Sequence, residues 1–537
     1  MTVSLIGNVL TAMEVNDGWS STTGGSLSEE ADIIIQGAGS LSEKVNNATE
    51  LFYNNNATWI TGVPYDVAAG DVYEDYGFVV WCNSTTPIST LQLLAGSGGT
   101  ANTGVWNVVP DNYTGGFLPK VATFKRPVDA GSAMNGYIDT FGFVVGSTVS
   151  IMGNIETAFF DQITVFRGLR TDGTGNDFET IRSADQDTNI YGIVTALAGS
   201  FILKGGIFLG PETGDATSSF SDTAAVAVWG DEPVHSGFYD IDIRGTGTTV
   251  DFDACLIRQE DSGNTYTRWN ISIDGTNEGN EPVFTDTNSI FDGFDTLTLR
   301  STSSLNGTKL DNGNRVTQNS GLISECDIVN ANRGDGESFI LSDYPSRIQN
   351  CSFTQSSGHA IEFTTLASGK SITFTGNSFT GYDGVNGTND TASSGPTNAA
   401  IYNNSFGDVT LNIVDGEGIL SVRNGPGATT TVVQAVTLTL GGIIANADAG
   451  KSSEVRIYTA GTTTELDGSD GIAVTGDGTG SFTFSFQQGD PPVDIRIFNV
   501  SYQPVNLLNF TLPASNTTIP IQQIFDRNYE EGLTPFP

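Results

Sequence analysis

The chain has 537 residues, and its 61 acidic against 22 basic side chains give a formal net charge of −39. A surface this negative repels phosphate backbones and anionic lipids, so nucleic acids and membranes are excluded as partners. Glycine is frequent (65 residues), only 15% of residues are charged, and 31 Phe and 15 Tyr supply bulk. This composition predicts an all-β chain with many turns, and the length predicts about three domains.

Residues 1–168 are predicted to form a β-sandwich. Alternating or continuously apolar segments indicate strands, and glycine-rich clusters separate them. The segments are 31–35, 77–81, 121–124, 142–145 and 156–165. Trp81 lies inside an apolar strand and is expected in the core. Trp59 and Trp106 are flanked by Asn, Thr and Gly, which makes them candidates for stacking on the sugar rings of a glycan; core packing is the alternative.

Residues 169–425 are predicted to form a right-handed parallel β-helix, because a short phrase recurs there. The phrase reads Glu325-Cys326-Asp327-Ile328, Asn350-Cys351-Ser352-Phe353, Asn377-Ser378-Phe379 and Asn404-Ser405-Phe406. Its last residues, 328, 353, 379 and 406, are 25, 26 and 27 residues apart. Self-similarity at a nearly fixed period indicates coils that bury their apolar sides by stacking. We therefore expect the three Asn residues to occupy equivalent turns. Cys326 and Cys351 should stack as two buried thiols, with a disulfide as the alternative.

Residues 426–537 are predicted to form a second β-sandwich. A β-branched run opens it, and further strand patterns follow at 454–458, 481–486 and 493–498. The longest insertion in the preceding region, 381–396, is rich in Gly, Asn, Ser and Thr and is expected to be a surface loop.

Catalytic candidates are few. No phosphate-binding loop or dinucleotide fingerprint occurs, and neither His235 nor His359 has a nucleophile-elbow context. Glycan cleavage needs a pair of carboxylates, and Asp327, Asp343 and Glu362 lie in consecutive coils from which they could project together. A chain with 61 acidic residues also produces such sets by chance. We predict no catalytic residue, and a polysaccharide lyase or hydrolase is the alternative.

The segment Glu156 to Val165 resembles the closing strand of jelly-roll, lectin-like and carbohydrate-binding-module sandwiches, where an aromatic-Asp-x-Ile pattern ends the domain. Trp19 and the small-residue run 37–41 fit the opening strands of the same families. The resemblance implies a jelly roll, and it places Asp161 at a position that binds a structural Ca²⁺ in some of these modules. A plain strand-end Asp is the alternative, and no other cofactor is expected.

The order of sandwich, β-helix and sandwich resembles virion proteins of tailed phages. Lys204-Gly205-Gly206-Ile207-Phe208-Leu209-Gly210 looks like the opening segment of phage β-helix proteins, and 488–498 with 526–529 resembles their terminal domain. The resemblance implies a non-enzymatic structural protein, exposed on the virion as a head decoration or capsid-associated protein. Its partners would be further copies, with a trimer favoured, and capsid or tail proteins.

Two other functions stay open at this point. One is a tail fibre or tailspike that binds or cleaves host surface glycans, and the other is a surface-layer or adhesin subunit. The residues from Met1 to Asn8 lack a basic region followed by a long apolar run. This pattern predicts synthesis in a host cytoplasm without ordinary export, which fits a virion protein better than a surface-layer protein.

Overall fold

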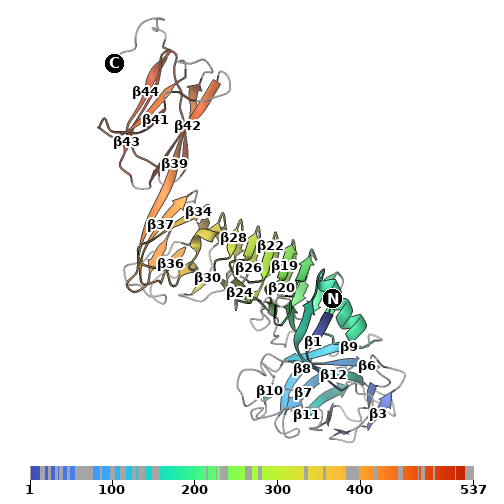
Figure 1. The fold of residues 1–537 in the computed structure, drawn as a ribbon. Coiled ribbons are helices and arrows are strands. Elements are labelled where there is room, and N and C mark those ends of the chain that lie inside the picture. The colour runs from blue at the N-terminus through green and yellow to red at the C-terminus, as the bar shows by residue number, and fades with distance from the viewer. Residues whose placement is uncertain are drawn as a thin grey trace. The chain divides into compact units, whose positions relative to one another are not determined.

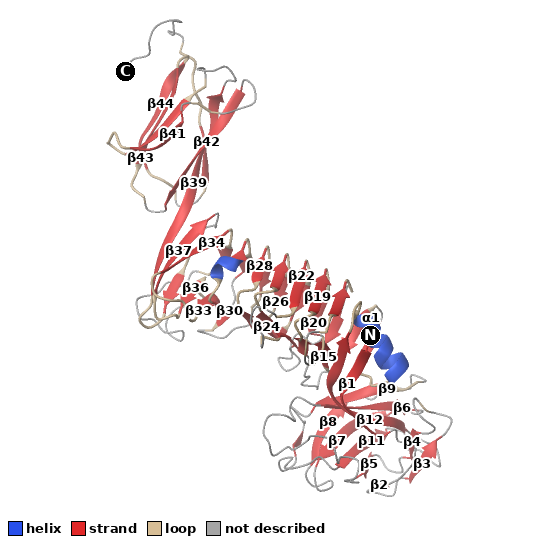
Figure 2. Ribbon diagram, in the orientation of Figure 1, coloured by secondary structure: helices blue, strands red, loops and turns tan. Residues whose placement is uncertain are grey.

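The structure is a computed structural model, and it divides into two compact units. Unit 1 comprises residues 1–322 and 329–332, and unit 2 comprises residues 323–328 and 333–537. The described residues are 2–11, 18–21, 26–30, 34, 40–44, 49–54, 77–84, 88–96, 103–108, 116–123, 129–130, 140–147, 158–197, 199–212, 214, 216–224, 227–229, 240–259, 269–275, 281–331, 337–354, 358–382, 398–414, 420–445, 452–469, 471–472, 478–487, 490–513 and 516–526. Almost all of them lie in strands and turns, so the predicted all-β class is confirmed (Figures 1 and 2).

Unit 1 begins with a β-sandwich of two sheets. One sheet has the order β10-β8-β7-β11-β5-β2; the other joins β3, β4, β12, β1, β6 and β9. The strands are β1 (Thr2–Thr11), β2 (Trp19–Ser21), β3 (Ser26–Glu30), β4 (Ser40–Lys44), β5 (Thr49–Asn54), β6 (Gly77–Ser84), β7 (Ile88–Gly96), β8 (Thr103–Val108), β9 (Leu118–Thr123), β10 (Asp129–Ala130), β11 (Thr140–Ser147) and β12 (Ala158–Asp172). Phe52, Phe78, Phe143 and Phe160 lie in the core between them. The predicted core position of Trp81 is confirmed, since its side chain is 4% exposed.

Strand β12 belongs to the sandwich and to the β-helix at once. Residues 158–166 pair antiparallel with β6, whereas residues 168–171 pair parallel with β15 (Gly206–Leu209), the first strand of the next coil. The change of partner occurs at Gly168. A Cβ atom there would lie 2.0 Å from the carbonyl oxygen of Gly206, so the two backbones approach too closely for any larger residue. The connection between the two folds is therefore a continuous strand without a linker.

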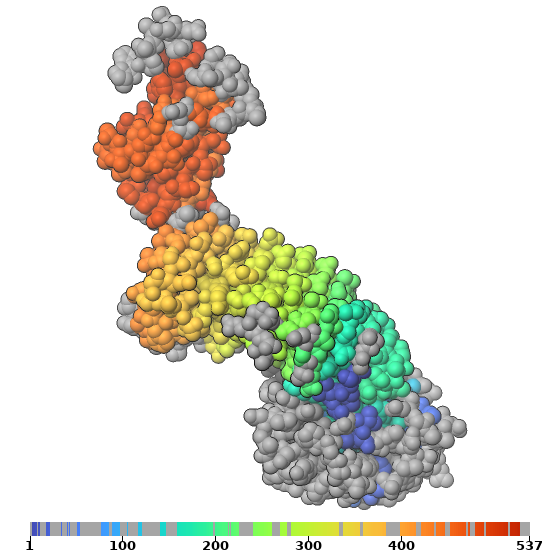
Figure 3. Space-filling model, in the orientation of Figure 1, coloured from blue at the N-terminus to red at the C-terminus, as the bar shows by residue number. Residues whose placement is uncertain are grey.

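The β-helix coils of unit 1 each contribute strands to three parallel sheets (Figure 1). In Figure 3 these coils form successive green bands packed against one another. The first sheet contains β15, β18 (Asp240–Ile243), β21 (Trp269–Ile273), β24 (Phe294–Leu299) and β27 (Arg315–Gln318). The second contains β14 (Ser200–Leu203), β17 (Ala227–Trp229), β20 (Leu256–Gln259), β23 (Ile290–Asp292) and β26 (Lys309–Asp311), and β13 (Val194–Leu197) is added to its start antiparallel to β14. The third contains β16 (Ser218–Asp222), β19 (Thr248–Asp253), β22 (Val283–Thr287) and β25 (Ser303–Asn306).

A short helical segment packs on the first coils. It consists of α1 (Phe178–Ser183) and a π-helical turn, η5 (Ala184–Asn189). Phe178 is buried and contacts Phe201, Phe220 and Phe252, which extends the aromatic core of the coils to the helix. This helix was not among the predicted elements. Its signal is the Asp177-x-x-Thr180 spacing, because both side chains cap the helix start.

The coils of unit 2 also contribute strands to three sheets. The first sheet contains β30 (Ser338–Ser342), β33 (His359–Phe363), β36 (Ile401–Asn403) and β38 (Val422–Asn424). The second contains β29 (Asp327–Val329), β32 (Ser352–Thr354) and β35 (Ser378–Thr380). The third contains β28 (Leu322–Ser324), β31 (Ile348–Gln349), β34 (Lys370–Thr375), β37 (Asp408–Val414) and β39 (Thr429–Ala445). A 3₁₀ turn, η6 (Pro345–Arg347), precedes β31.

The repeated phrase is confirmed for three of its four copies. Asp327 pairs with Ser352, and Phe353 pairs with Phe379 and stacks on it at 4.7 Å. The fourth copy was wrongly aligned, because Phe406 follows a strand of a different sheet and is 69% exposed.

The prediction that Asn350 and Asn377 occupy equivalent turns was also wrong, by one residue. Gly376, not Asn377, shares the left-handed conformation of Asn350, with φ values of 67° and 55°. Asn377 instead turns inward, where its Oδ1 accepts a hydrogen bond of 3.0 Å from the Cys351 amide. Cys326 and Cys351 are free and buried, as expected.

Unit 2 ends with a second sandwich. One sheet has the order β45-β39-β42 and the other β41-β40-β43-β44. The strands are β40 (Glu454–Thr459), β41 (Glu465–Ser469), β42 (Gly478–Gln487), β43 (Val493–Asn499), β44 (Tyr502–Phe510) and β45 (Thr517–Pro520). Strand β39 repeats the arrangement of β12: residues 429–434 pair with β37 of the last coil, and residues 435–445 pair with β42. The described part of this sandwich is the orange-red surface in Figure 3.

No helix in the described part of the chain has the length and apolar character needed to span a bilayer.

Candidate functional site

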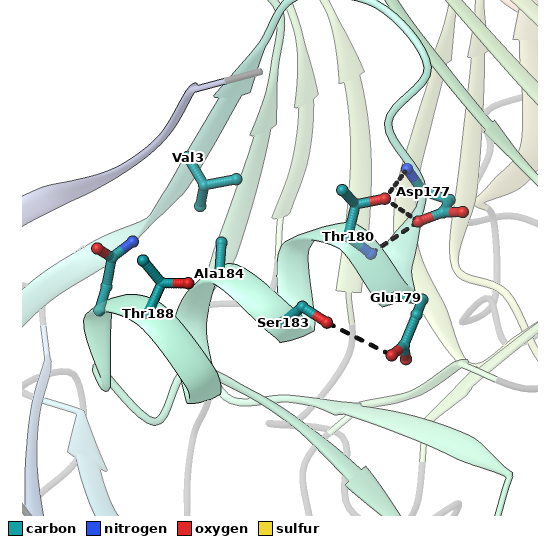
Figure 4. Close-up of a pocket in the computed structure, with 8 residues that line it drawn as sticks. Val3, Asp177, Glu179, Thr180, Ser183, Ala184 and Thr188 are labelled. Atoms are coloured by element: carbon teal, nitrogen blue, oxygen red, sulfur yellow. Dashed lines mark hydrogen bonds between the residues drawn. The ribbon is translucent and has the colours of Figure 1, made fainter.

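A pocket of about 560 Å³ lies beside the helical segment of unit 1 (Figure 4). Its lining comes from β1, α1, η5 and the residue before α1: Val3, Asp177, Glu179, Thr180, Ser183, Ala184, Thr188 and Asn189. Figure 4 shows Val3 of β1 opposite Ala184, with Thr188 beside this apolar pair and with Asp177 and Glu179 at the other end of the helical segment. A volume of this size is in the range of small-ligand sites.

Local hydrogen bonds explain why the helical segment forms at this position. The Thr180 amide donates to Asp177 Oδ1 at 2.7 Å, and the Asp177 amide donates to Thr180 Oγ1 at 3.3 Å. The Phe178 amide donates to Asp222 Oδ2 of β16 at 2.8 Å. These bonds satisfy amides that a helix start leaves without internal partners, and the last one holds α1 against the coil.

Two carboxyl groups near the pocket differ strongly in their surroundings. Glu179 is exposed, and a hydrogen bond from Arg182 at 2.7 Å lowers its pKa. Asp185 is fully buried in η5, and this burial raises its pKa to about 7, although the Tyr191 and Val194 amides donate to it. Glu179 is therefore the ionised acceptor that a ligand in the pocket can reach, whereas Asp185 holds the π-helical turn in place.

The lining offers neutral hydrogen-bonding groups and carboxylate acceptors beside a small apolar pair, Val3 and Ala184. Ser183, Thr188 and Asn189 offer hydroxyl and amide groups, and Asp177 and Glu179 offer acceptors. Groups of this kind match a ligand rich in hydroxyls. No local sequence pattern points to these residues, because the pocket joins Val3 to residues 177–189, which are distant from it in the chain.

The structure places the three predicted carboxylates on two sheets and in a turn. Asp327 lies in β29 of the second sheet, is exposed and accepts a hydrogen bond of 2.5 Å from Ser352 Oγ. Glu362 lies in β33 of the first sheet. Asp343 lies in the turn after β30, where the Thr365 amide donates to it at 2.8 Å. Asp343 therefore stabilises a turn of the next coil, and the three carboxylates belong to two sheets and a turn.

Glu362 instead belongs to a polar column of the first sheet. It pairs with Tyr402, which pairs with Arg423 of the next strand, and His359 stacks on Tyr402 at 4.9 Å. The Asn404 side chain donates to Glu362 at 3.0 Å. Tyr402 is 2% exposed and His359 and Arg423 are 0% exposed, so these groups are part of the packed interior. His359 Nδ1 accepts a hydrogen bond from the Ala399 amide at 3.2 Å, which requires the neutral imidazole.

The predicted glycan-binding and metal residues are placed as follows. Trp59 lies outside the described residues, and Trp106 lies in β8 with its side chain outside them. Asp161 is buried within β12, next to a bulge at which Gln162 has a φ of 44°. Among the described residues, no group of three or more His, Cys, Asp or Glu could hold a metal ion. Calcium binding at Asp161 stays a prediction.

Two buried carboxyls point into the β-helix core of unit 1. Asp222 and Asp286 lie above and below Phe252 in one column of the third sheet. Burial raises the pKa of Asp222, and it raises the pKa of Asp286 to about 6. Asp286 also accepts a hydrogen bond from the Thr308 hydroxyl.

We expect this burial to make unit 1 more stable in mild acid. Because the folded pKa of Asp286 lies above the unfolded value of about 4, the folded state holds its proton more tightly. The stabilisation is complete below pH 4 and is lost as pH rises to about 6. Asp286→Asn should therefore raise the unfolding free energy at pH 7 by roughly 3 kcal/mol and leave it nearly unchanged at pH 4. Urea unfolding at both pH values measures this. The exposed Asp253→Asn is the control, and an equal gain at both pH values would contradict the expectation.

The sequence matches no protein-family model and no curated protein. The xylan-binding domain CBM22-1 of Paenibacillus barcinonensis Xyn10C covers 30% of this chain and 96% of its own length, with 10% identity and a TM-score of 0.21. The family 11 carbohydrate-binding module of Clostridium thermocellum covers 30% of this chain and 97% of its own length, with 14% identity and a TM-score of 0.20. TM-scores this low carry no argument about function. The β-sandwich in unit 1 rests on its own strand pairing.

Proposed function

We propose that the protein is a non-enzymatic structural protein of a tailed-phage virion, exposed on the particle as a head decoration or capsid-associated protein. The observation that supports a structural role is the pair of shared strands. β12 joins the first sandwich to the coils of unit 1, and β39 joins the last coil of unit 2 to the second sandwich. Both are backbone-paired on each side of the junction.

A shared strand resists bending in a way that a linker does not. Rotation at a flexible linker breaks no hydrogen bond, whereas rotation within β12 or β39 breaks inter-strand bonds and uncovers buried side chains. Buried apolar side chains of β12 lie on both sides of the junction at Gly168. Ile163, Val165 and Phe166 precede it, and Leu169 follows it. Such a connection suits a protein that must keep a binding domain in a set orientation under load.

The charge supports the same role. A net charge of −39 keeps exposed copies soluble and discourages contact with nucleic acid released at lysis. Each copy would be held in the particle by capsid or tail proteins and by further copies of the chain.

A second candidate function is glycan binding, and the hydroxyl-rich pocket beside α1 favours it. This is the function of the tail-fibre alternative, without cleavage. Sugar hydroxyls would hydrogen-bond with Ser183, Thr188 and Asn189, and Glu179 would act as an acceptor.

Labelling of purified particles tests the structural proposal. Gold-conjugated antibody against the purified chain should decorate the head of intact virions. Label found only in the particle-free lysate would contradict the structural proposal.

The purified chain should also leave host capsule and lipopolysaccharide at their original size. Depolymerisation that Glu362→Gln or Asp327→Asn abolishes would establish the enzymatic alternative. Calorimetric titration with oligosaccharides from the same host separates glycan binding from both, because Thr188→Val should weaken it and the exposed Thr249→Val should not.

A further inference from the structure

The strand β42 forms an edge of the second sandwich that carries no charge. Among the described strands it pairs only with β39, over the whole length from Gly478 to Gln487. Its ten residues are Gly, Thr, Ser, Phe and Gln, in a chain with 83 charged side chains (61 acidic, 22 basic). A long exposed edge presents unpaired backbone amides and carbonyls, and proteins normally protect such edges with charges, prolines or bulges.

The other described edge strands of this sandwich carry these protections. β41 contains Glu465 and Asp467. β44 contains Pro504, and Asn509 has a left-handed φ of 51°. β45 has four residues and ends at Pro520. Among these described edges, only β42 has no charged residue, no proline and no residue with a positive φ. Its edge is therefore suited to pairing with another strand.

The side chains of β42 are self-complementary. Ser481, Thr483 and Ser485 are exposed on one face, and Phe484 and Phe486 are buried on the other. Phe482 is half-buried at the rim of the core. If two β42 strands pair antiparallel about a two-fold axis, Ser and Thr lie opposite Ser and Thr, and the Phe rows of both cores become continuous.

The missing charges on β42 make pairing with a second copy possible. Paired strands lie about 5 Å apart, so acidic side chains on two facing copies would repel each other, and β42 has none. We propose that β42 pairs antiparallel with β42 of a second copy, which joins two chains through one continuous sheet. This contact is independent of the virion role proposed above. It makes a two-fold dimer, whereas the resemblance to phage proteins implied a trimer.

Sedimentation equilibrium of the full chain and of a matched pair of variants tests the proposal. Thr483→Glu places like charges at the paired edge and should raise the dimer dissociation constant at least about tenfold at low salt, with partial recovery at high salt. Thr463→Glu adds the same charge at an exposed position between β40 and β41 and should leave the dissociation constant unchanged. Amide exchange provides a second readout, since the β42 amides should exchange more slowly as the concentration of the wild-type chain rises.

Three results would overturn the proposal. They are a wild-type chain that stays monomeric at tens of micromolar, a trimeric mass, and an oligomer that Thr483→Glu does not weaken. None of these results bears on whether the protein is found in a virion, so the two proposals fail separately.

Discussion

Replacement of Phe252 by alanine should lower the unfolding free energy of the unit 1 coils by about 3–5 kcal/mol. The ring is 0% exposed and lies within 6.4 Å of four other phenylalanine rings: Phe178, Phe220, Phe284 and Phe291. These rings come from α1, from neighbouring coils and from two sheets. The cavity left by alanine could not close without moving several of them, because interiors are closely packed.

Denaturant unfolding monitored by hydrogen exchange of peptides from β19 to β23 measures the loss of unfolding free energy in these coils. Phe406→Ala is the matched control, since that ring is 69% exposed and its removal should change stability by less than about 0.5 kcal/mol. Similar losses for both substitutions would mean that the aromatic cluster does not hold the coils together.

Gly168→Ala should lower stability by at least about 2 kcal/mol, and it should loosen both sides of the junction at once. The new methyl group would lie 2.0 Å from a backbone oxygen and 2.8 Å from the Cα atom of Gly206. Backbone atoms in two paired strands cannot move aside as a flexible side chain can. The strand must shift, and the shift disturbs the pairing of β12 with β15 and with β6.

Hydrogen exchange by mass spectrometry reads the two sides separately, through peptides covering 158–166 and 206–209. Gly116→Ala serves as the control, because no atom lies within 4 Å of its new methyl group. Faster exchange on one side only would show that the junction is not a single rigid strand, and it would weaken the structural role proposed above.

Much of the fold could be predicted because strand patterns are local. Alternating or continuously apolar segments predicted β6, β11, β40 and β43 within a few residues of their observed bounds. The repeat predicted the stacking of Ile328, Phe353 and Phe379. It failed at Phe406, because a similar phrase can occur in a turn, and only strand pairing distinguishes the two.

The candidate site could not be predicted in the same way. Asp177, Glu179 and Thr188 line the pocket with Val3, which is more than 170 residues earlier in the chain. The predicted carboxylates also depended on register: Asp327 and Glu362 belong to different sheets of the coils. The number of residues in each turn decides which sheet a side chain joins, and that number varies from coil to coil.

The amino-acid sequence by itself determined the all-β class, the stacking of coils and the negative surface, because composition and short-range periodicity carry these properties. Only the tertiary structure decided which strands are shared between domains, which acidic side chains are buried and which edge is left open. Asp286 shows the reason. Its neighbours in sequence resemble those of any exposed Asp in a strand, but coils from both sides enclose it and raise its pKa to about 6.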